Sequence, residues 1–86
     1  QVFVDKDEID LTQTEYNILA LLSQHTGKVL TYATIIRSVW GSMDDGSVKK
    51  LQVNMANIRR KLEKNPAEPQ YIFTEIGVGY WMREAD

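Results

Sequence analysis

The sequence predicts an α+β fold, in which three helices in the middle of the chain are preceded by a short β-hairpin and followed by a second one. Apolar residues recur at steps of three and four between residues 12 and 64, the spacing of one face of a helix. Short segments rich in β-branched and aromatic residues stand at both ends and favour strands. With 86 residues, 43% of them hydrophobic, the chain is long enough for one small core, so we expect a single domain.

The first hairpin is predicted by two short strand-like segments, residues 2–4 and 8–11, on either side of a turn at residues 5–7. A hairpin of this size is marginally stable by itself. We therefore expect it to pack on the helices, or to belong to a sheet whose other strands precede Gln1.

Capping residues mark the first two helices. Thr12 and Glu15 have the spacing of a capping box, which satisfies free N–H groups at a helix start, and Gly27 is a typical left-handed helix end. After a short link at residues 28–30, Thr31 is a second N-cap candidate, and its short helix is expected to end at Gly41. Residues 42–46 have turn-forming residues without periodicity and predict a loop.

The third helix, predicted over residues 47–64, has two sides of different chemistry. Its apolar stripe consists of Val48, Leu51, Met55, Ile58 and Leu62. At about 100° per residue, the opposite side carries Lys49, Lys50, Val53, Asn57, Arg60 and Lys64. A helix that only faces water usually intersperses acids for pairing with its bases, but the only acid here is Glu63. The outer side is therefore predicted to bind an anion.

The position of the cations sharpens this prediction. Lys49 and Lys50 lie in the first turn, where the helix macrodipole disfavours a cation by about 0.3–1 kcal/mol each. Lys61 and Lys64 lie near the other end, where the same dipole favours them. Only the first-turn pair therefore argues for function independently of helix stability.

The net charge of −2 does not exclude nucleic acid, because the charge is unevenly distributed. Residues 46–64 carry +5, residues 1–15 carry −4, residues 65–86 carry −3, and residues 16–45 are balanced. A local basic face matters more for phosphate binding than the total charge does.

The end of the chain predicts a second hairpin. Pro66 and Pro69 prevent the third helix from continuing, and residues 71–76 and 80–82 have strand character on either side of a glycine-containing tip. The order hairpin, helix, helix, loop, basic helix, hairpin is that of a winged helix-turn-helix. In that fold the third helix enters the major groove of DNA and the last hairpin is the wing.

Five segments carry a family resemblance: LTQTEYNILALL, GKVLT, SVWG, NIRRKLE and YIFTEIGVGY. In sequence and spacing they resemble the C-terminal DNA-binding domain of OmpR/PhoB-type response regulators, over nearly the whole chain. The segments MANIRRKLE and TEIGVGY are most similar to the regulators of the Kdp potassium-transport operon. Because the family's N-terminal sheet normally has four strands, Gln1 is expected to lie inside that sheet.

The resemblance implies a transcription factor of a two-component system, in which a receiver domain phosphorylated by a sensor kinase precedes residue 1. It also implies head-to-tail binding of two domains on a direct DNA repeat, with the isolated domain monomeric. A contact with RNA polymerase is implied for the loop that contains Asp44 and Asp45.

The chain departs from the family pattern at several positions. The family usually carries Arg-Thr where this sequence has Lys49 and Lys50, and arginines where it has Ala56, Asn57 and Ile76. The phosphate or minor-groove contacts of those three arginines cannot be transferred to this chain. Isoleucine at position 76 can offer only van der Waals contact, or turn inward.

Side-chain chemistry gives the remaining expectations. Val53 can contact a thymine methyl group or only pack at the helix rim, and Asn57 can bind adenine with two hydrogen bonds or serve as an ordinary solvent-facing amide. Arg60 is expected on phosphate, whereas Arg59 lies nearer the apolar stripe and can fold over it. The predicted DNA contacts are Lys49, Lys50, Val53, Asn57, Arg60, Lys64, Thr74 and Gly77.

Other classes of function have less support. Phe73, Trp81, Tyr80 and Trp40 could stack on single-stranded nucleic acid, but a small domain needs aromatics for its core. No cysteine and only one histidine, His25, are present, so the sequence predicts neither a metal site nor a cofactor.

No catalytic set of residues has a recognisable spacing, so an enzyme is not expected. The sequence has no signal-like or transmembrane stretch, which favours a cytoplasmic protein. The main rival to DNA is an acidic protein that docks on the basic helix.

Overall fold

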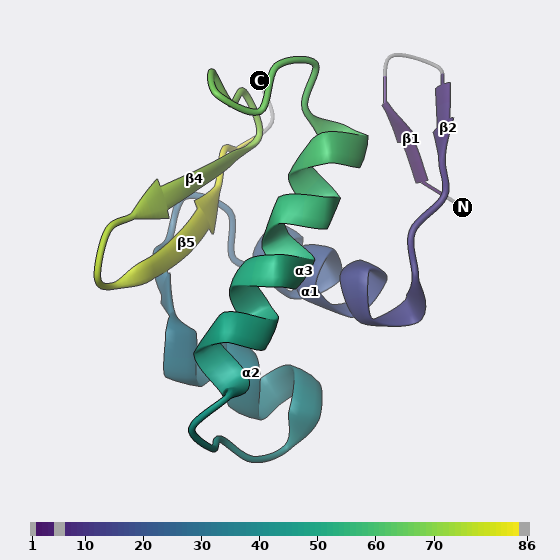
Figure 1. Cartoon of the computed structure of the whole chain (residues 1–86). Coiled ribbons are helices and arrows are strands. Elements are labelled where there is room, and N and C mark those ends of the chain that lie inside the picture. The colour runs from purple at the N-terminus through teal and green to yellow at the C-terminus, as the bar shows by residue number, and fades with distance from the viewer. Residues whose placement is uncertain (1, 5–6, 85–86) are drawn as a thin grey trace.

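The computed structural model describes the backbone of residues 2–4 and 7–84 and the side chains of residues 8–84; most of the turn predicted at residues 5–7 lies outside this part of the chain. The elements follow in the order β1 (Val2–Val4), β2 (Asp7–Ile9), α1 (Gln13–Gln24), β3 (Leu30–Thr31), α2 (Tyr32–Trp40), α3 (Ser47–Leu62), β4 (Ile72–Glu75) and β5 (Gly79–Met82) (Figure 1). The predicted order of hairpin, three helices and hairpin is confirmed.

The N-terminal strands form an antiparallel hairpin in which Val2 lies opposite Ile9 and Val4 lies opposite Asp7. The second strand begins one residue earlier than predicted, at Asp7, and ends at Ile9, two residues before the predicted end. Figure 1 shows this hairpin and the C-terminal hairpin on opposite sides of α3. Ile9 packs against the core, as expected for a hairpin that depends on the helices.

The two predicted N-caps and the predicted end of the second helix are confirmed. The Thr12 hydroxyl accepts a hydrogen bond from the Glu15 N–H at 3.1 Å, and the Glu15 carboxylate accepts one from the Thr12 N–H at 2.9 Å. The Thr31 hydroxyl caps α2 by accepting from the Thr34 N–H at 3.1 Å. Gly41 ends α2 in the left-handed conformation, with φ of 85°.

The link between α1 and α2 differs from the prediction. The helix α1 ends at Gln24, so Gly27 is not its end; Gly27 has φ of 80° and donates its N–H to the Met82 carbonyl at 2.8 Å. The next residues form β3, a strand that the sequence did not predict. Two residues are too few to show a strand pattern, and their strand character depends on pairing with a distant part of the chain.

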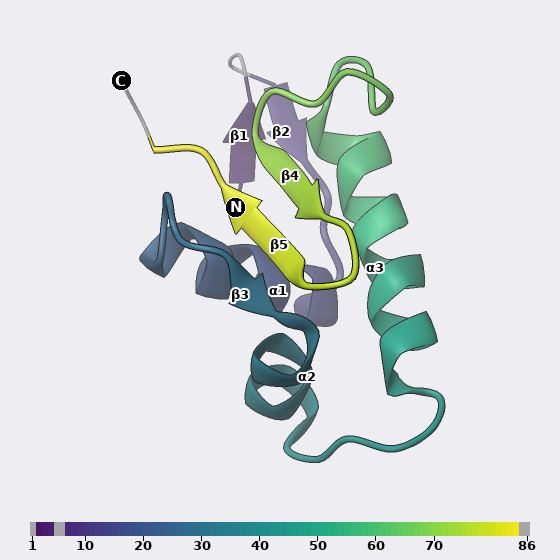
Figure 2. The same cartoon turned by 90° about the vertical axis from the view of Figure 1, so that its left-hand side faces the viewer.

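The strand β3 completes a three-stranded antiparallel sheet with the order β3-β5-β4 (Figure 2). Leu30 lies opposite Tyr80, and Thr31 lies opposite Gly79. A Cβ atom on Gly79 would lie 1.8 Å from the Leu30 carbonyl oxygen, so only glycine allows this close approach of the two strands.

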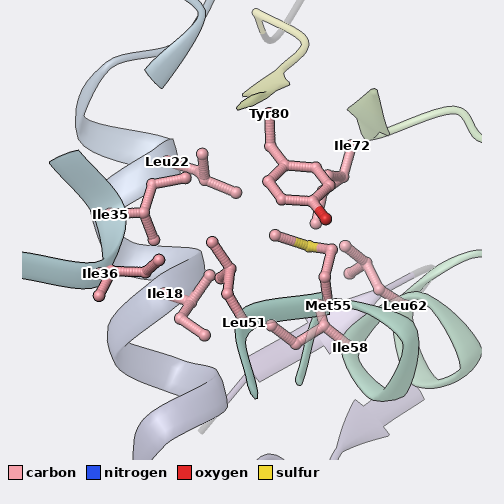
Figure 3. Packing of buried hydrophobic residues seen from close by; sticks show 10 residues of the cluster. All are labelled: Ile18, Leu22, Ile35, Ile36, Leu51, Met55, Ile58, Leu62, Ile72 and Tyr80. Carbon is pink, nitrogen blue, oxygen red and sulfur yellow. The ribbon is translucent and has the colours of Figure 1, made fainter. Parts of the chain in front are cut away.

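The core lies where the three helices meet the inner face of the sheet (Figure 3). Its buried hydrophobic side chains are Ile18 and Leu22 from α1, Ile35 and Ile36 from α2, Leu51, Met55, Ile58 and Leu62 from α3, and Ile72 and Tyr80 from the hairpin. The helix α3 thus supplies four of the ten residues, as its apolar stripe predicted, while Val48 on the same stripe is half-buried.

The end of α3 corrects the sequence prediction. The helix ends at Leu62, and Glu63 turns to extended backbone and is buried, with 5% of its surface exposed. Its carboxylate accepts hydrogen bonds from the backbone N–H groups of Gln70, Tyr71 and Ile72 at 2.8, 3.1 and 2.9 Å. This acid therefore ties the segment that enters β4 to the end of α3, and Lys64 lies beyond the helix and not on its outer face.

A second buried acid, Glu15, joins the start of α1 to the end of α3. The Glu15 carboxylate, besides closing the cap of α1, lies 2.6 Å from the Lys61 ammonium near the end of α3. Burial raises the pKa of Glu15, but the hydrogen bonds from Lys61 and Thr12 outweigh this and leave that pKa below its ordinary value of 4.5. Lys61 is therefore a structural residue, and its ion pair with Glu15 holds α1 against α3.

Candidate nucleic-acid interface

The helix α3 begins at a loop that is closed by its own side chains. The Asp44 carboxylate accepts hydrogen bonds from the Gly46 N–H and from the Ser47 hydroxyl, both at 3.0 Å, and the Asp44 N–H donates to the Ser47 hydroxyl at 2.9 Å. The hydrogen bonds from Ser47 and Gly46 lower the pKa of Asp44. Asp44 thus has a structural role here that the sequence prediction did not include, while Asp45 is exposed.

The outer side of α3 is open. Lys49, Lys50 and Arg60 are exposed, and Val53 keeps 50% of its surface exposed in the middle of the helix. Figure 1 shows this helix running across the front of the molecule with no other described element over it. The structure therefore brings together the predicted basic face over residues 47–62, without Lys64.

Three of the predicted contact residues interact with neighbouring side chains on this face. The Lys50 ammonium lies 4.6 Å from the centre of the Trp40 ring, so it packs over the half-buried end of α2. Arg60 donates a hydrogen bond to the Oδ1 atom of Asn57, which is half-buried. The Asn57 amide is therefore oriented by its own helix, with its oxygen directed toward a guanidinium group.

Arg59 joins α3 to the wing. Its Nη2 atom donates to the Thr74 hydroxyl at 2.7 Å and to the Ile72 carbonyl at 3.2 Å, and its guanidinium lies 5.5 Å from the centre of the Tyr80 ring. The sequence left its role open, and the structure shows that it folds over the core side of the helix. Because one guanidinium contacts both strands of the hairpin, it fixes the angle between α3 and the wing.

The wing carries an apolar tip. Ile76 keeps 93% of its surface exposed, so it does not turn inward, and Val78 is 49% exposed. Gly77 lies between them with φ of 77°, a conformation that side-chain-bearing residues rarely adopt. Thr74 is exposed beside Arg59, so the wing presents a hydroxyl near α3 and methyl groups at its end.

The aromatic residues separate into two groups. Tyr80 is buried in the core, as the sequence predicted. Phe73 and Trp81 instead stack on each other on the outer face of the hairpin, with ring centres 4.6 Å apart, and the Trp81 indole donates to Glu75 at 3.0 Å. The expectation that all of these aromatics serve the core is wrong for this pair, because strand alternation turns them away from Tyr80 and Ile72.

Neither a metal site nor a membrane segment occurs in the described part of the chain. Residues 8–84 contain no group of three or more acidic or histidine side chains placed to hold a metal ion. Among the described helices, none has the length and the apolar character needed to cross a membrane.

The arrangement of α1, α2 and α3 with a hairpin packed beside α3 defines a winged-helix domain. The family model described as "Transcriptional regulatory protein, C terminal" matches residues 6–82. The chain therefore belongs to this family, which comprises the C-terminal domains of OmpR/PhoB-type response regulators.

Solved structures agree with this assignment. The response regulator DrrB of Thermotoga maritima, an OmpR/PhoB homolog, is 29% identical with a TM-score of 0.86, over 95% of this chain and 37% of DrrB. The DNA-binding domain of Escherichia coli CpxR is 30% identical with a TM-score of 0.80, over 98% of this chain and 82% of that domain.

A third relative was solved with its ligand. The Klebsiella pneumoniae RstA DNA-binding domain, in complex with the RstA box, is 25% identical with a TM-score of 0.79, over 87% of this chain and 74% of that one. The present chain thus spans about 37% of the length of DrrB and most of the two isolated domains.

Proposed function

We propose that this chain is the sequence-specific DNA-binding domain of a two-component transcriptional regulator. In this proposal α3 enters the major groove and the hairpin of β4 and β5 contacts the neighbouring backbone. The open basic face of α3 carries the proposal, because exposed cations surround a half-exposed Val53 in a helix that otherwise packs on the core. Membership of the family and the likeness to RstA support it.

The contacts divide by chemistry. Lys49, Lys50 and Arg60 neutralise phosphates, which supplies affinity without sequence information. Val53 and Asn57 face the base edges in the middle of the helix and supply discrimination. The wing contributes Thr74 and the backbone around Gly77, and Lys64, beyond the end of α3, can reach phosphate as an exposed side chain.

The larger assembly is part of the same proposal. A receiver domain, phosphorylated by a sensor kinase, controls this domain in the full-length regulator. Two domains bind head to tail on a direct repeat, while the isolated domain is monomeric and binds weakly, because one small basic face neutralises few phosphates. Within the loop before α3, Asp45 is the better candidate for an RNA polymerase contact, because Asp44 already accepts two hydrogen bonds there.

The test is a binding-site selection on a library of duplexes with a randomised core. We expect a defined sequence to be enriched, and the purified domain to retain this duplex in the presence of excess scrambled duplex. Poly-glutamate is the matched competitor for the rival proposal, since a face that recognises only an acidic protein would release DNA to it. Competition by poly-glutamate equal to that by the selected duplex, with no enrichment, would contradict DNA recognition.

A further inference from the structure

We infer that Asn57 and Arg60 act as one unit on α3 that selects guanine and not adenine. This inference rests on the proposed insertion of α3 into the major groove. It moves Arg60 from a phosphate contact to a base contact and adds the base that the helix selects. The two residues are three positions apart, so their side chains lie on the same face of the helix.

The first step is the orientation of the amide. Asn57 Oδ1 accepts a hydrogen bond from Arg60 Nη2, so the oxygen of the planar amide is directed along its own helix. The Nδ2 group is on the other branch of the amide and has no hydrogen-bond partner among residues 8–84. What this pair offers outward is therefore a set of N–H donors: those of Asn57 Nδ2 and the remaining ones of the Arg60 guanidinium.

The second step is the match to a base edge. Asparagine binds adenine by accepting from N6 and donating to N7, which needs both branches of the amide. In this pair Arg60 occupies one lone pair of Asn57 Oδ1, and the N6 amino group of adenine would have to approach the other beside the N–H donors of Arg60, which repel it. Guanine presents two acceptors, N7 and O6, and so matches a surface made of donors.

The neighbouring residues set the position of this contact. Val53 lies four residues before Asn57, about 6 Å along the helix axis, and its half-exposed methyl groups suit a thymine methyl group. Asn54 cannot play the part of Asn57, because its Nδ2 group donates to the Lys50 carbonyl at 2.9 Å. The selected site should therefore contain a thymine and a guanine at nearby base pairs.

The experiment begins with the duplex enriched from the randomised library. The base pair at which Asn57→Ala relaxes the preference identifies the contact, with Asn54→Ala as the matched control that should leave the preference intact. We expect guanine at that base pair. Replacing it by 7-deazaguanine, which lacks N7, or by adenine should weaken binding about tenfold, whereas inosine, which keeps N7 and O6, should bind like guanine.

Arg60→Met is the decisive variant. It frees the Asn57 oxygen, so the preference at the same base pair should move from guanine toward adenine, and a thermal melt should show that the exposed substitution leaves the domain folded. Adenine at the Asn57-dependent base pair, an unchanged guanine preference in Arg60→Met, or an equal loss by Asn57→Ala on selected and scrambled duplexes would overturn the inference alone. Failure to enrich any duplex would overturn the proposed function as well.

Discussion

Lys49 and Lys50 lie in the first turn of α3, on its open outer side, where the helix macrodipole disfavours a cation. If each meets a phosphate, replacing both by alanine should weaken binding to selected and scrambled duplexes alike. The slope of log affinity against log salt should fall by up to about 1.8. Binding measured by fluorescence anisotropy over a series of salt concentrations tests this expectation.

The matched control is Lys28→Ala, an exposed lysine in the link before β3, which should leave the salt slope unchanged. The double variant should also keep its melting temperature, although Lys50→Ala removes the contact with the Trp40 ring. Unchanged binding at low salt together with a lower melting temperature would assign the pair a structural role.

Glu63 illustrates a residue whose role is set by distant partners. Its buried carboxylate accepts three backbone N–H groups, so Glu63→Ala should lower the free energy of unfolding by about 2–4 kcal/mol, because three donors lose a charged acceptor. Urea unfolding measures the loss, and Glu68→Ala, at an exposed site in the same segment, is the control. A loss no larger than that of Glu68→Ala would contradict the capping role.

Comparing Glu15 with Glu63 shows which roles of single residues the sequence can predict. The Thr12 and Glu15 cap was predictable because both partners lie within one helical turn. The role of Glu63 was not, because its partners follow seven to nine residues later, at the entrance to β4 and beyond the end of its own helix. The spacing of Asn57 and Arg60 places both on one face, and arginine can only donate, but the sequence does not show whether the two side chains bond to each other or point apart.

At the scale of elements, the join between β3 and β5 depends on Gly79. Its missing side chain allows the strand to approach the Leu30 carbonyl, which a Cβ atom would meet at 1.8 Å. Gly79→Ala should therefore destabilise the domain by several kcal/mol, roughly 3 or more, because backbone atoms must move on both strands. Thermal unfolding followed by circular dichroism measures the change.

Gly46→Ala is the matched control for this prediction. Gly46 has a negative φ of −94°, and a Cβ atom there would meet only an Asp44 oxygen at 3.8 Å. We expect a change within about 1 kcal/mol of zero, since alanine fits that conformation and reduces the entropy of the unfolded chain. Equal losses in the two variants would show that close strand approach is not what Gly79 provides.

The wing tip is the second element with a testable role. Ile76 is exposed and offers no hydrogen bond, so the native wing should read little sequence. Ile76→Arg should raise affinity for all duplexes, steepen the salt slope by up to about 0.9, and favour A·T-rich flanks, where a narrow minor groove attracts arginine. Competition between duplexes with A·T-rich and G·C-rich flanks measures this preference.

Val78→Arg is the control, because Val78 lies on the other side of Gly77 and tests whether any added charge at the tip suffices. The opposite outcome is equally informative. Strong flank preference in the native domain, lost together with affinity in a folded Ile76→Arg variant, would make Ile76 itself a wedge between bases.

At the scale of the whole molecule, the three-helix plan and the core stripe of α3 were predictable because they depend on local periodicity. The joints between elements were not. Arg59 connects α3 with residues of the hairpin that lie 13 to 15 positions later in the chain. The strand β3 pairs with β5, which lies about 50 residues later. Such contacts form only when the chain folds. Composition and spacing can therefore identify residues able to make them, but not which partners they contact.

The pair of Glu15 and Lys61 spans the helical layer and gives the fold a pH dependence. The pKa of Glu15 is lower in the folded chain than its ordinary value of 4.5, so folding favours the charged carboxylate. The resulting stabilisation is fully present above the unfolded-state pKa and is lost as the pH falls through the folded-state pKa. Glu15→Gln should therefore lower the free energy of unfolding by about 2 kcal/mol at pH 7 and by progressively less below about pH 4.

Urea unfolding of wild type and variant between pH 7 and pH 3 measures this difference. Lys61→Met should remove much of the same pH-dependent stability, because it takes away the cation 2.6 Å from the carboxylate, whereas Lys64→Met, beyond the helix end, should not. In a double-mutant cycle, the coupling between Glu15→Gln and Lys61→Met should fall toward zero as Glu15 becomes protonated. A coupling that stays constant across this range would mean that the two side chains support the fold by packing, and that the pH dependence arises from other acids.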